Sequence, residues 1–153
     1  MKTFKIDNVE IKNRYILAPM AGFTDYSFRT LAASFGSDLV YTEMLYCESV
    51  VCKSKATLLD LNMTKVDKKT YQAKIALQIF GGKKEHILKS IPIIEKEAEY
   101  DFLDFNCGCP VPKVVKQNTG SKWLNRIDEL YDLLKELVKI SHKPVLVKMR
   151  TGF

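Results

Sequence analysis

The chain has 153 residues, of which 46% are hydrophobic and 27% are charged, and its formal net charge is +6. This balance excludes an intrinsically disordered chain, and no apolar run approaches the roughly 20 residues of a membrane-spanning helix, so we expect no membrane association. The excess of lysine and arginine favours an anionic partner such as nucleic acid, although a lysine-rich composition alone would also produce it.

Five short apolar runs are expected to form strands, with helices in the intervals between them. The strands are expected over residues 15–20, 39–44, 75–80, 102–107 and 145–150. The helices are expected near residues 28–35, 48–59, 87–98 and 127–138. Thr24 or Asp25 is a candidate cap for the first helix, and Pro92 is expected to kink or split the third. The residues from 60 to 70 are interpreted as a polar connection.

No short hairpin turn separates consecutive strands in this pattern. Strands that are joined through helices run parallel, with right-handed crossovers. Two α/β architectures therefore fit: an open doubly wound sheet, or the first five strands and four helices of an incomplete (β/α)8 TIM barrel. No linker interrupts the chain, so we expect residues 1–153 to form one structural unit.

The carboxyl ends of the predicted strands carry an unusual concentration of reactive and polar side chains. In parallel sheets and barrels, ligands bind at this edge. The side chains found there are Glu43, Gln78, Asn106, Cys109, Lys148 and Arg150. Plain connecting loops would not be expected to gather an acid, two amides, a thiol and two cations, so we interpret this edge as an active site.

Side-chain alternation sharpens the interpretation of the fourth strand. Asp104 and Asn106 share one face, and Leu103, Phe105 and Cys107 share the other, more apolar face. In a barrel the polar face would point to the lumen, and Cys107 would be a buried structural thiol. Cys109 lies past the strand in a Gly-Cys-Pro turn, where a thiol can reach a ligand, although its spacing alone leaves its reactivity open.

Other uses of the cysteines are less consistent with the sequence. Cys107 and Cys109 form a C-x-C pair, but no second pair or nearby histidine completes a tetrahedral set, so we expect no metal site. The four cysteines are too few for a disulfide scaffold, and the first ten residues lack the apolar core of a signal peptide. We therefore expect a cytoplasmic protein.

A basic loop follows the Gly-Cys-Pro turn. Its cations are Lys113, Lys116, Lys122 and Arg126. Because the loop begins beside the proposed site, these side chains are candidates for holding the phosphates of a large anionic substrate. The residues themselves leave a second interpretation open, that of an ordinary solvated loop.

Taken together, these strand ends resemble the tRNA-dihydrouridine synthase family. The matching stretches are residues 17–25 (LAPMAGFTD), 42–44 (TEM), Gln78-Ile79 with Gly81, 104–110 (DFNCGCP) continuing to Lys113-Val114, Gly120-Ser121, and 147–152 (VKMRTG). One such motif would be weak, but together they follow the family's order over nearly the whole chain. The resemblance implies a flavin-dependent TIM barrel that reduces the C5–C6 double bond of uridines in tRNA, with NADPH or NADH as the source of electrons.

The resemblance also implies roles for individual residues. Pro19, Met20 and Ala21 would line the ring of the FMN cofactor, Gln78 would hydrogen-bond it, and Lys148 would lie near its N1/O2 edge, where a cation stabilises the reduced flavin.

On the substrate side, Cys109 would be the catalytic acid, since a thiol with an ordinary pKa of about 8.5 is mostly protonated at neutral pH. Asn106 would lie next to the uracil base, and Arg150 and Lys113 would contact the tRNA substrate. Lys122-Trp123 departs from the small and aliphatic residues that are usual after Gly-Ser, so we expect altered packing there.

The length of the chain bears on its activity. A barrel of this type takes roughly 250 residues, so 153 residues would hold its amino-terminal portion without the later strands or the family's helical tRNA-binding domain. We expect such a fragment to be inactive alone, to retain FMN weakly, and to self-associate through open sheet edges. Two alternatives remain: another FMN-dependent TIM-barrel oxidoreductase that acts on a small molecule, and an inactive truncated half-barrel.

Overall fold

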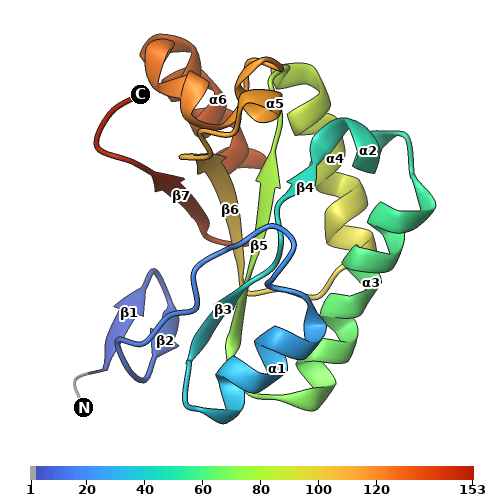
Figure 1. The fold of residues 1–153 in the computed structure, drawn as a ribbon, viewed down its shortest axis with the longest axis vertical. Helices are drawn as coiled ribbons and strands as arrows, with labels where there is room; N and C mark the ends of the chain where they lie inside the picture. Colours follow the sequence, from blue (N-terminus) through green and yellow to red (C-terminus); the bar gives the residue numbers. More distant parts are fainter. Residues whose placement is uncertain (1–2) are drawn as a thin grey trace.

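A curled, parallel β-sheet with helices packed on its outer face forms the centre of the computed structural model, which describes residues 3–153 (Figure 1). The strands of the sheet are β3 (Leu39–Tyr41), β4 (Leu45–Tyr46), β5 (Lys74–Phe80), β6 (Phe102–Cys107) and β7 (Val145–Met149). Their order is β3-β5-β6-β7, with β4 also pairing with β5, and every pair is parallel. The protein is therefore an α/β half-barrel, consistent with the predicted partial TIM barrel.

The connections between the strands are mostly helical. The helices are α1 (Tyr26–Ser34), α2 (Cys47–Val51), α3 (Lys55–Thr70), α4 (Lys84–Glu97), α5 (Pro112–Val115), the 3-10 helix η1 (Gly120–Asn125) and α6 (Ile127–Ile140). Asp25 caps α1 by accepting a hydrogen bond from the backbone N–H of Phe28 at 2.8 Å, as predicted. In residues 3–153, no helix combines the length and the apolar character that crossing a membrane requires.

The main hydrophobic core lies between the outer face of the sheet and the helices. Leu103, Phe105 and Cys107 of β6 point into it, together with buried residues of α4 and α6. The opposite face of β6 presents Asp104 and Asn106, which confirms the predicted alternation along this strand. Alternate side chains along β6 thus point either into the core or toward the interior of the half-barrel.

An amino-terminal hairpin, which the sequence analysis did not predict, precedes the five predicted strands. β1 (Phe4–Ile6) pairs antiparallel with β2 (Val9–Ile11) through a turn in which Asp7 adopts a φ of +52°. Aspartate and asparagine tolerate this left-handed conformation, which allows the tight turn. Ile11 is fully buried in a second core with Leu39 and Phe102, so the hairpin packs on the inner face of the sheet, at the left in Figure 1.

The polar connection expected from 60 to 70 is wrong, because α3 runs through it. Ser54 caps the helix, because its side chain accepts a hydrogen bond from the Thr57 N–H at 3.3 Å. Its buried face includes Thr64, whose hydroxyl donates to the Leu61 carbonyl, and Asp67, whose Oδ2 accepts from Arg29. A helix that buries polar side chains does not show the apolar stripe from which helices are predicted.

Smaller differences concern the ends of the strands and the proline helix. Residues 15–20 do not form a regular strand, and Ile16 makes a single parallel bridge to Leu39. Of the predicted strand over 39–44, only Leu39–Tyr41 is a regular strand, and β4 begins after it at Leu45. α4 continues through Pro92 without being split.

Candidate active site

A cavity of about 340 Å³ lies at the carboxyl ends of the strands, on the inner side of the sheet. Its walls are formed by Pro19, Ala21, Met44, Gln78, Asn106, Gly108, Cys109, Pro110, Val111, Lys148, Met149 and Arg150. The volume falls in the range of about 300–1,000 Å³ that is usual for small-molecule sites. Residues from five widely separated segments of the sequence therefore meet in one cavity.

Most of the residues singled out from the sequence line this cavity. The residues that do not contribute to its walls are Met20, Glu43 and the cations of the basic loop, Lys113, Lys116, Lys122 and Arg126. Met20 and Lys113 are both exposed. Sequence reasoning gave no role to Met44, although the T-E-M stretch placed it at a strand end. Val111 and Met149 were also missed, because nothing in an isolated apolar residue distinguishes a cavity wall from core packing.

A chain of hydrogen bonds connects the side chains on the floor of the cavity. Gln78 Nε2 donates to Asp104 Oδ2 at 2.6 Å, and Asn106 Nδ2 donates to Gln78 Oε1 at 2.9 Å. The backbone N–H of Gln78 donates to Thr42 Oγ1 at 3.0 Å, which ties β5 to the segment after β3. Gln78, Asp104 and Asn106 are all buried, so little water competes for these bonds.

Asn106 also holds the turn that carries Cys109. Its Oδ1 accepts the backbone N–H of Gly108 at 3.1 Å and that of Cys109 at 3.0 Å. From the other side, the Ser121 N–H donates to the Cys109 carbonyl at 2.9 Å. Gly120 has a φ of +64°, and a Cβ atom there would lie 2.5 Å from the same carbonyl oxygen, so the close approach requires glycine. The partly exposed Cys109 thiol is thus presented to the cavity by a turn that is braced on both sides.

Asp104 is the most deeply buried carboxylate of the site. Burial raises its pKa to about 6, although the hydrogen bond from Gln78 and the charge of Lys148 act in the opposite direction. Asp104 Oδ1 has no hydrogen-bond partner among the described residues. Asp104 was expected to face the lumen, but the sequence gave it no role.

The two cysteines of the C-x-C pair have different environments. Cys107 is fully buried, and burial raises the pKa of its thiol to about 12, which makes it an inert core residue as expected from strand parity. Cys109 is the one that borders the cavity. In the described part of the chain, no three His, Cys, Asp or Glu side chains converge in an arrangement that would hold a metal ion.

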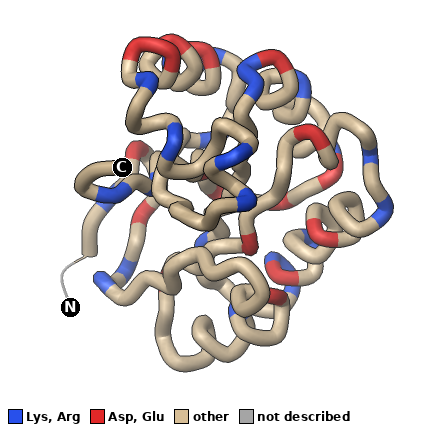
Figure 2. Tube along the Cα trace, turned by 45° about the horizontal axis from the view of Figure 1, so that its top comes forward, with Lys and Arg blue, Asp and Glu red and all other residues tan. Residues whose placement is uncertain are grey.

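Lysine and arginine residues occupy the loops around this end of the sheet (Figure 2). Lys113 and Lys116 are in and directly after α5, near the cavity rim. Arg126 is engaged in packing: its guanidinium stacks over the Trp123 ring at 4.0 Å and donates to the Asn118 carbonyl at 2.6 Å. In the same loop, Lys122 lies over the Phe153 ring, with Nζ 5.2 Å from the ring centroid.

Trp123 occupies the outer core, where the sequence predicted altered packing. Its ring meets Phe105 edge-to-face with 5.8 Å between centroids, and its Nε1 donates to the Gly81 carbonyl at 2.8 Å. The indole therefore joins η1 to the end of β5.

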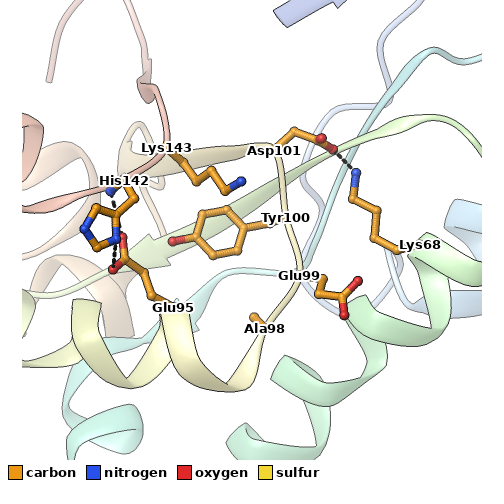
Figure 3. Close-up of a pocket in the computed structure, with 8 residues that line it drawn as sticks. All are labelled: Lys68, Glu95, Ala98, Glu99, Tyr100, Asp101, His142 and Lys143. Carbon is orange, nitrogen blue, oxygen red and sulfur yellow. Dashed lines mark hydrogen bonds and ion pairs between the residues drawn. The ribbon is translucent and has the colours of Figure 1, made fainter.

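A larger cavity of about 460 Å³ lies at the opposite, amino-terminal end of the sheet (Figure 3). Its charged groups are mostly paired: Lys68 with Asp101, and His142 with Glu95 through Nδ1 at 2.8 Å. In barrels this end contributes to stability, whereas chemistry is located at the other end. We therefore interpret the cavity as structural.

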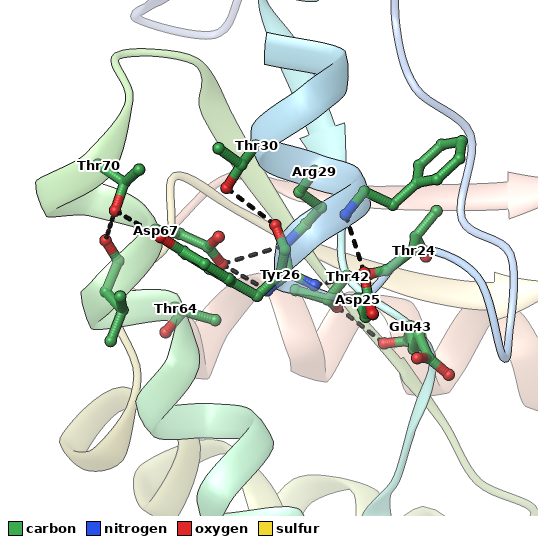
Figure 4. Close-up of polar contacts among 12 residues, drawn as sticks. Thr24, Asp25, Tyr26, Arg29, Thr30, Thr42, Glu43, Thr64, Asp67 and Thr70 are labelled. Carbon is green, nitrogen blue, oxygen red and sulfur yellow. Dashed lines mark hydrogen bonds and ion pairs between the residues drawn. The ribbon is translucent and has the colours of Figure 1, made fainter. Parts of the chain in front are cut away.

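A buried ion pair supports the loop that contains Pro19 and Ala21 (Figure 4). Asp67 Oδ2 of α3 accepts from Arg29 Nη2 at 2.6 Å and from Nε at 3.0 Å, and Arg29 Nη1 donates to the Thr24 carbonyl at 2.6 Å. Thr24 Oγ1 in turn accepts from the Met20 N–H at 3.2 Å. Interactions between α1 and α3 thus fix one wall of the candidate site.

Comparisons with known proteins find related sequences over nearly the whole chain. The family model for dihydrouridine synthases, "Dihydrouridine synthase (Dus)", matches residues 16–153. The chain is 32% identical over 148 residues to the "Probable tRNA-dihydrouridine synthase" of Helicobacter pylori strain 26695, covering 95% of this chain and 44% of that protein. It is 32% identical over 150 residues to tRNA-dihydrouridine synthase B of Vibrio cholerae and 34% over 149 residues to that of Klebsiella pneumoniae, each time covering 97% of this chain and 44% of the relative. The chain thus spans less than half the length of these relatives.

Proposed function

Because the chain belongs to the dihydrouridine synthase family, we propose that it forms the amino-terminal part of an enzyme that reduces uridine to 5,6-dihydrouridine in tRNA. The observation that carries this proposal is the cavity in which the Cys109 thiol, the Gln78 and Asn106 amides and the Lys148 amine converge. We further propose that the enzyme acts in the cytoplasm and takes electrons from NADPH or NADH.

The residues of the cavity fit FMN as the cofactor. Pro19 and Ala21 offer an apolar wall for a flat ring, while Gln78 and Lys148 offer a polar edge. A lysine ammonium suits a ring system that becomes negatively charged on reduction. When bound, FMN would supply a hydride to C6 of the uracil ring. Gln78 and Lys148 would hold the ring, and Met20 would contact it only after moving from its exposed position.

Cys109 is proposed to donate the proton that uracil C5 requires after C6 has been reduced. The turn that presents the thiol is held by Asn106 and Ser121, which restricts the direction from which the proton is delivered. The second amide hydrogen of Asn106 lies toward Met44 Sδ, with the Nδ2 atom 3.7 Å away. A sulfur atom is a weak acceptor, so a uracil carbonyl is a better partner for this hydrogen.

The basic side chains around the cavity are proposed to contact the tRNA backbone. Arg150 lines both the candidate site and a neighbouring cavity of about 370 Å³ that also includes Lys116. Lys113 lies on the short helix α5, which leads away from the site. Phosphate contacts of this type position a nucleic acid without reading its sequence, so Arg150 and Lys113 would contribute affinity and register.

We also infer that the 153 residues alone bind FMN weakly and self-associate. In residues 3–153 β7 pairs only with β6, so its other edge presents unpaired backbone groups. Phosphate-binding loops of such barrels lie after strands seven and eight, which the family relatives would contribute from the unmatched part of their length.

The test is the direct detection of dihydrouridine by mass spectrometry. Unmodified tRNA would be incubated with the natural polypeptide that contains these residues, FMN and NADPH, and free uridine would be offered in parallel. We expect dihydrouridine in the tRNA and none from free uridine. Reduction of a small pyrimidine without any reaction on tRNA would instead favour a small-molecule oxidoreductase.

A further inference from the structure

Asp104 is a buried carboxylate directly beneath the proposed site, and the proposed chemistry does not use it. It is 1% exposed and belongs to the inner face of β6, two residues before Asn106. Its only hydrogen bond within the described residues comes from Gln78. A buried, charged group with a single partner is costly, so a role for Asp104 beyond stability has to be considered.

The chemistry of a carboxylate dictates how the neighbouring amides are oriented. An ionised carboxylate accepts hydrogen bonds and cannot donate them, so Gln78 must turn its NH2 group toward Asp104. Gln78 Oε1 then faces Asn106, and Asn106 must turn its own NH2 group toward that oxygen.

These amide orientations direct Asn106 Oδ1 toward the turn that carries Cys109. The oxygen accepts both the Gly108 and the Cys109 backbone N–H groups. If the Asn106 amide were reversed, its NH2 group would face these two donors, and the bonds that hold the turn would be lost. The sequence of donors and acceptors from Asp104 to Cys109 therefore has one consistent arrangement.

We propose that Asp104 is a positioning residue that fixes the orientation of the Gln78 and Asn106 amides and, through them, the turn that presents the Cys109 thiol. That this turn serves catalysis rests on the proposed function; the control of the turn by Asp104 does not. Asp104 does not line the cavity and acts only through Gln78.

Protonation of Asp104 removes the constraint that the carboxylate places on Gln78, and only the Gly108 and Cys109 N–H groups then hold the Asn106 amide in its orientation. A neutral carboxyl group can donate its proton to Gln78 Oε1 as well as accept from Nε2, so both amide orientations become compatible with it. The charged and titratable groups near Asp104 are Lys148 of β7, the Tyr41 phenol of β3 and the Cys107 thiol of its own strand. Burial outweighs the favourable charge of Lys148 and raises the pKa of Asp104 to about 6, so mild acidification protonates this carboxylate.

The test follows the turn by NMR in the natural polypeptide that contains these residues. The signals to record are the side-chain NH2 groups of Gln78 and Asn106 and the backbone amides of Gly108 and Cys109. We expect all four to move with one shared midpoint near pH 6. If the carboxyl signal of Asp104 titrates while the Gly108 and Cys109 amides stay unchanged, the proposal is wrong. This measurement needs no variant and no enzymatic activity.

Asp104→Asn provides a second readout, with Asp101→Asn as the matched control. Asp101 lies just before the same strand at its opposite end, where it pairs with Lys68 and accepts the Ile75 N–H. We expect Asp104→Asn to abolish the shared titration and to make alkylation of Cys109 by iodoacetamide about two- to tenfold faster, as expected for the loss of one net hydrogen bond. Asp101→Asn should retain wild-type behaviour in both assays.

The same alkylation rate in the two variants would contradict the proposal. A failure to form dihydrouridine, together with a normal NMR titration, would instead contradict the proposed function and leave the role of Asp104 intact. The role of Asp104 and the proposed function can therefore fail independently of each other.

Discussion

Gln78 on β5 and Asp104 on β6 are direct neighbours in the parallel register, and their side chains meet with Nε2 and Oδ2 2.6 Å apart. Both residues occupy inner-face positions, so the register of two strands brings an amide and a carboxylate together inside the half-barrel. The remaining polar groups of the site follow from this pair, because Asn106 bonds to Gln78 and the Cys109 turn bonds to Asn106.

We predict that Asp104→Asn stabilises the fold at neutral pH. Because the folded-state pKa is raised from the ordinary 3.8 to about 6, the folded protein binds more protons than the unfolded chain between these values. The free energy of unfolding therefore falls as pH rises through this window, and the ionised carboxylate costs about 3 kcal/mol above it.

Urea unfolding at pH 7.5 and at pH 4 measures this effect. Asp104→Asn should be more stable than the wild type by about 1–3 kcal/mol at pH 7.5, and the difference should shrink toward zero at pH 4. A variant that is less stable than the wild type at pH 7.5 would show that the carboxylate stabilises the fold.

We predict that Gly120→Ala disturbs the turn that carries Cys109. The new Cβ would lie 2.5 Å from the Cys109 carbonyl and 2.7 Å from Val114 Cγ1, at a φ of +64°. The expected loss is about 2 kcal/mol or more of unfolding free energy, with a changed alkylation rate at Cys109. Gly36→Ala is the control, since its φ is +92° but no atom lies within 4 Å of the new Cβ. Gly36→Ala should lower the free energy of unfolding and leave the alkylation rate of Cys109 unchanged. If both variants changed the alkylation rate of Cys109 equally, the change could not come from a clash at Gly120.

Removal of one partner of the buried ion pair between Arg29 and Asp67 is predicted to be among the most destabilising single substitutions in the chain. Asp67→Ala leaves the guanidinium of Arg29 buried without its partner, which costs about 3–5 kcal/mol. The exposed pair between Lys89 and Glu85 serves as the comparison, and Glu85→Ala should leave the free energy of unfolding nearly unchanged. Thermal and urea unfolding of both variants would show the contrast, and similar losses in the two would contradict it.

The sequence predicted those parts of the fold in which apolar periodicity is strong. β6 spans the predicted residues, Phe102–Cys107, and the amphipathic segment near residue 127 becomes α6. Prediction failed where polar side chains are buried. The buried face of α3 includes Thr64 and Asp67, so the sequence of this helix lacks a continuous apolar stripe. The hairpin was missed because its strands are only three residues long.

The candidate site shows a similar division. Strand ends could be located from the sequence, and most of the side chains found there line one cavity, among them Gln78 and Cys109. The function of Asp104 could not be anticipated, because its contact with Gln78 depends on the register between two strands that are joined through α4. Likewise, the stacking of Arg126 on Trp123 depends on tertiary packing.

The most direct test of the proposed function compares two single cysteine variants of the natural polypeptide that contains this chain. Cys109→Ala removes the thiol at the cavity, whereas Cys52→Ala removes an exposed thiol outside its walls. Dihydrouridine in tRNA would be measured by mass spectrometry, together with the amount of bound flavin. We predict that Cys109→Ala loses dihydrouridine formation by at least about 100-fold while flavin remains bound, and that Cys52→Ala matches the wild type. Full activity of Cys109→Ala would contradict the assignment of Cys109 as the proton donor.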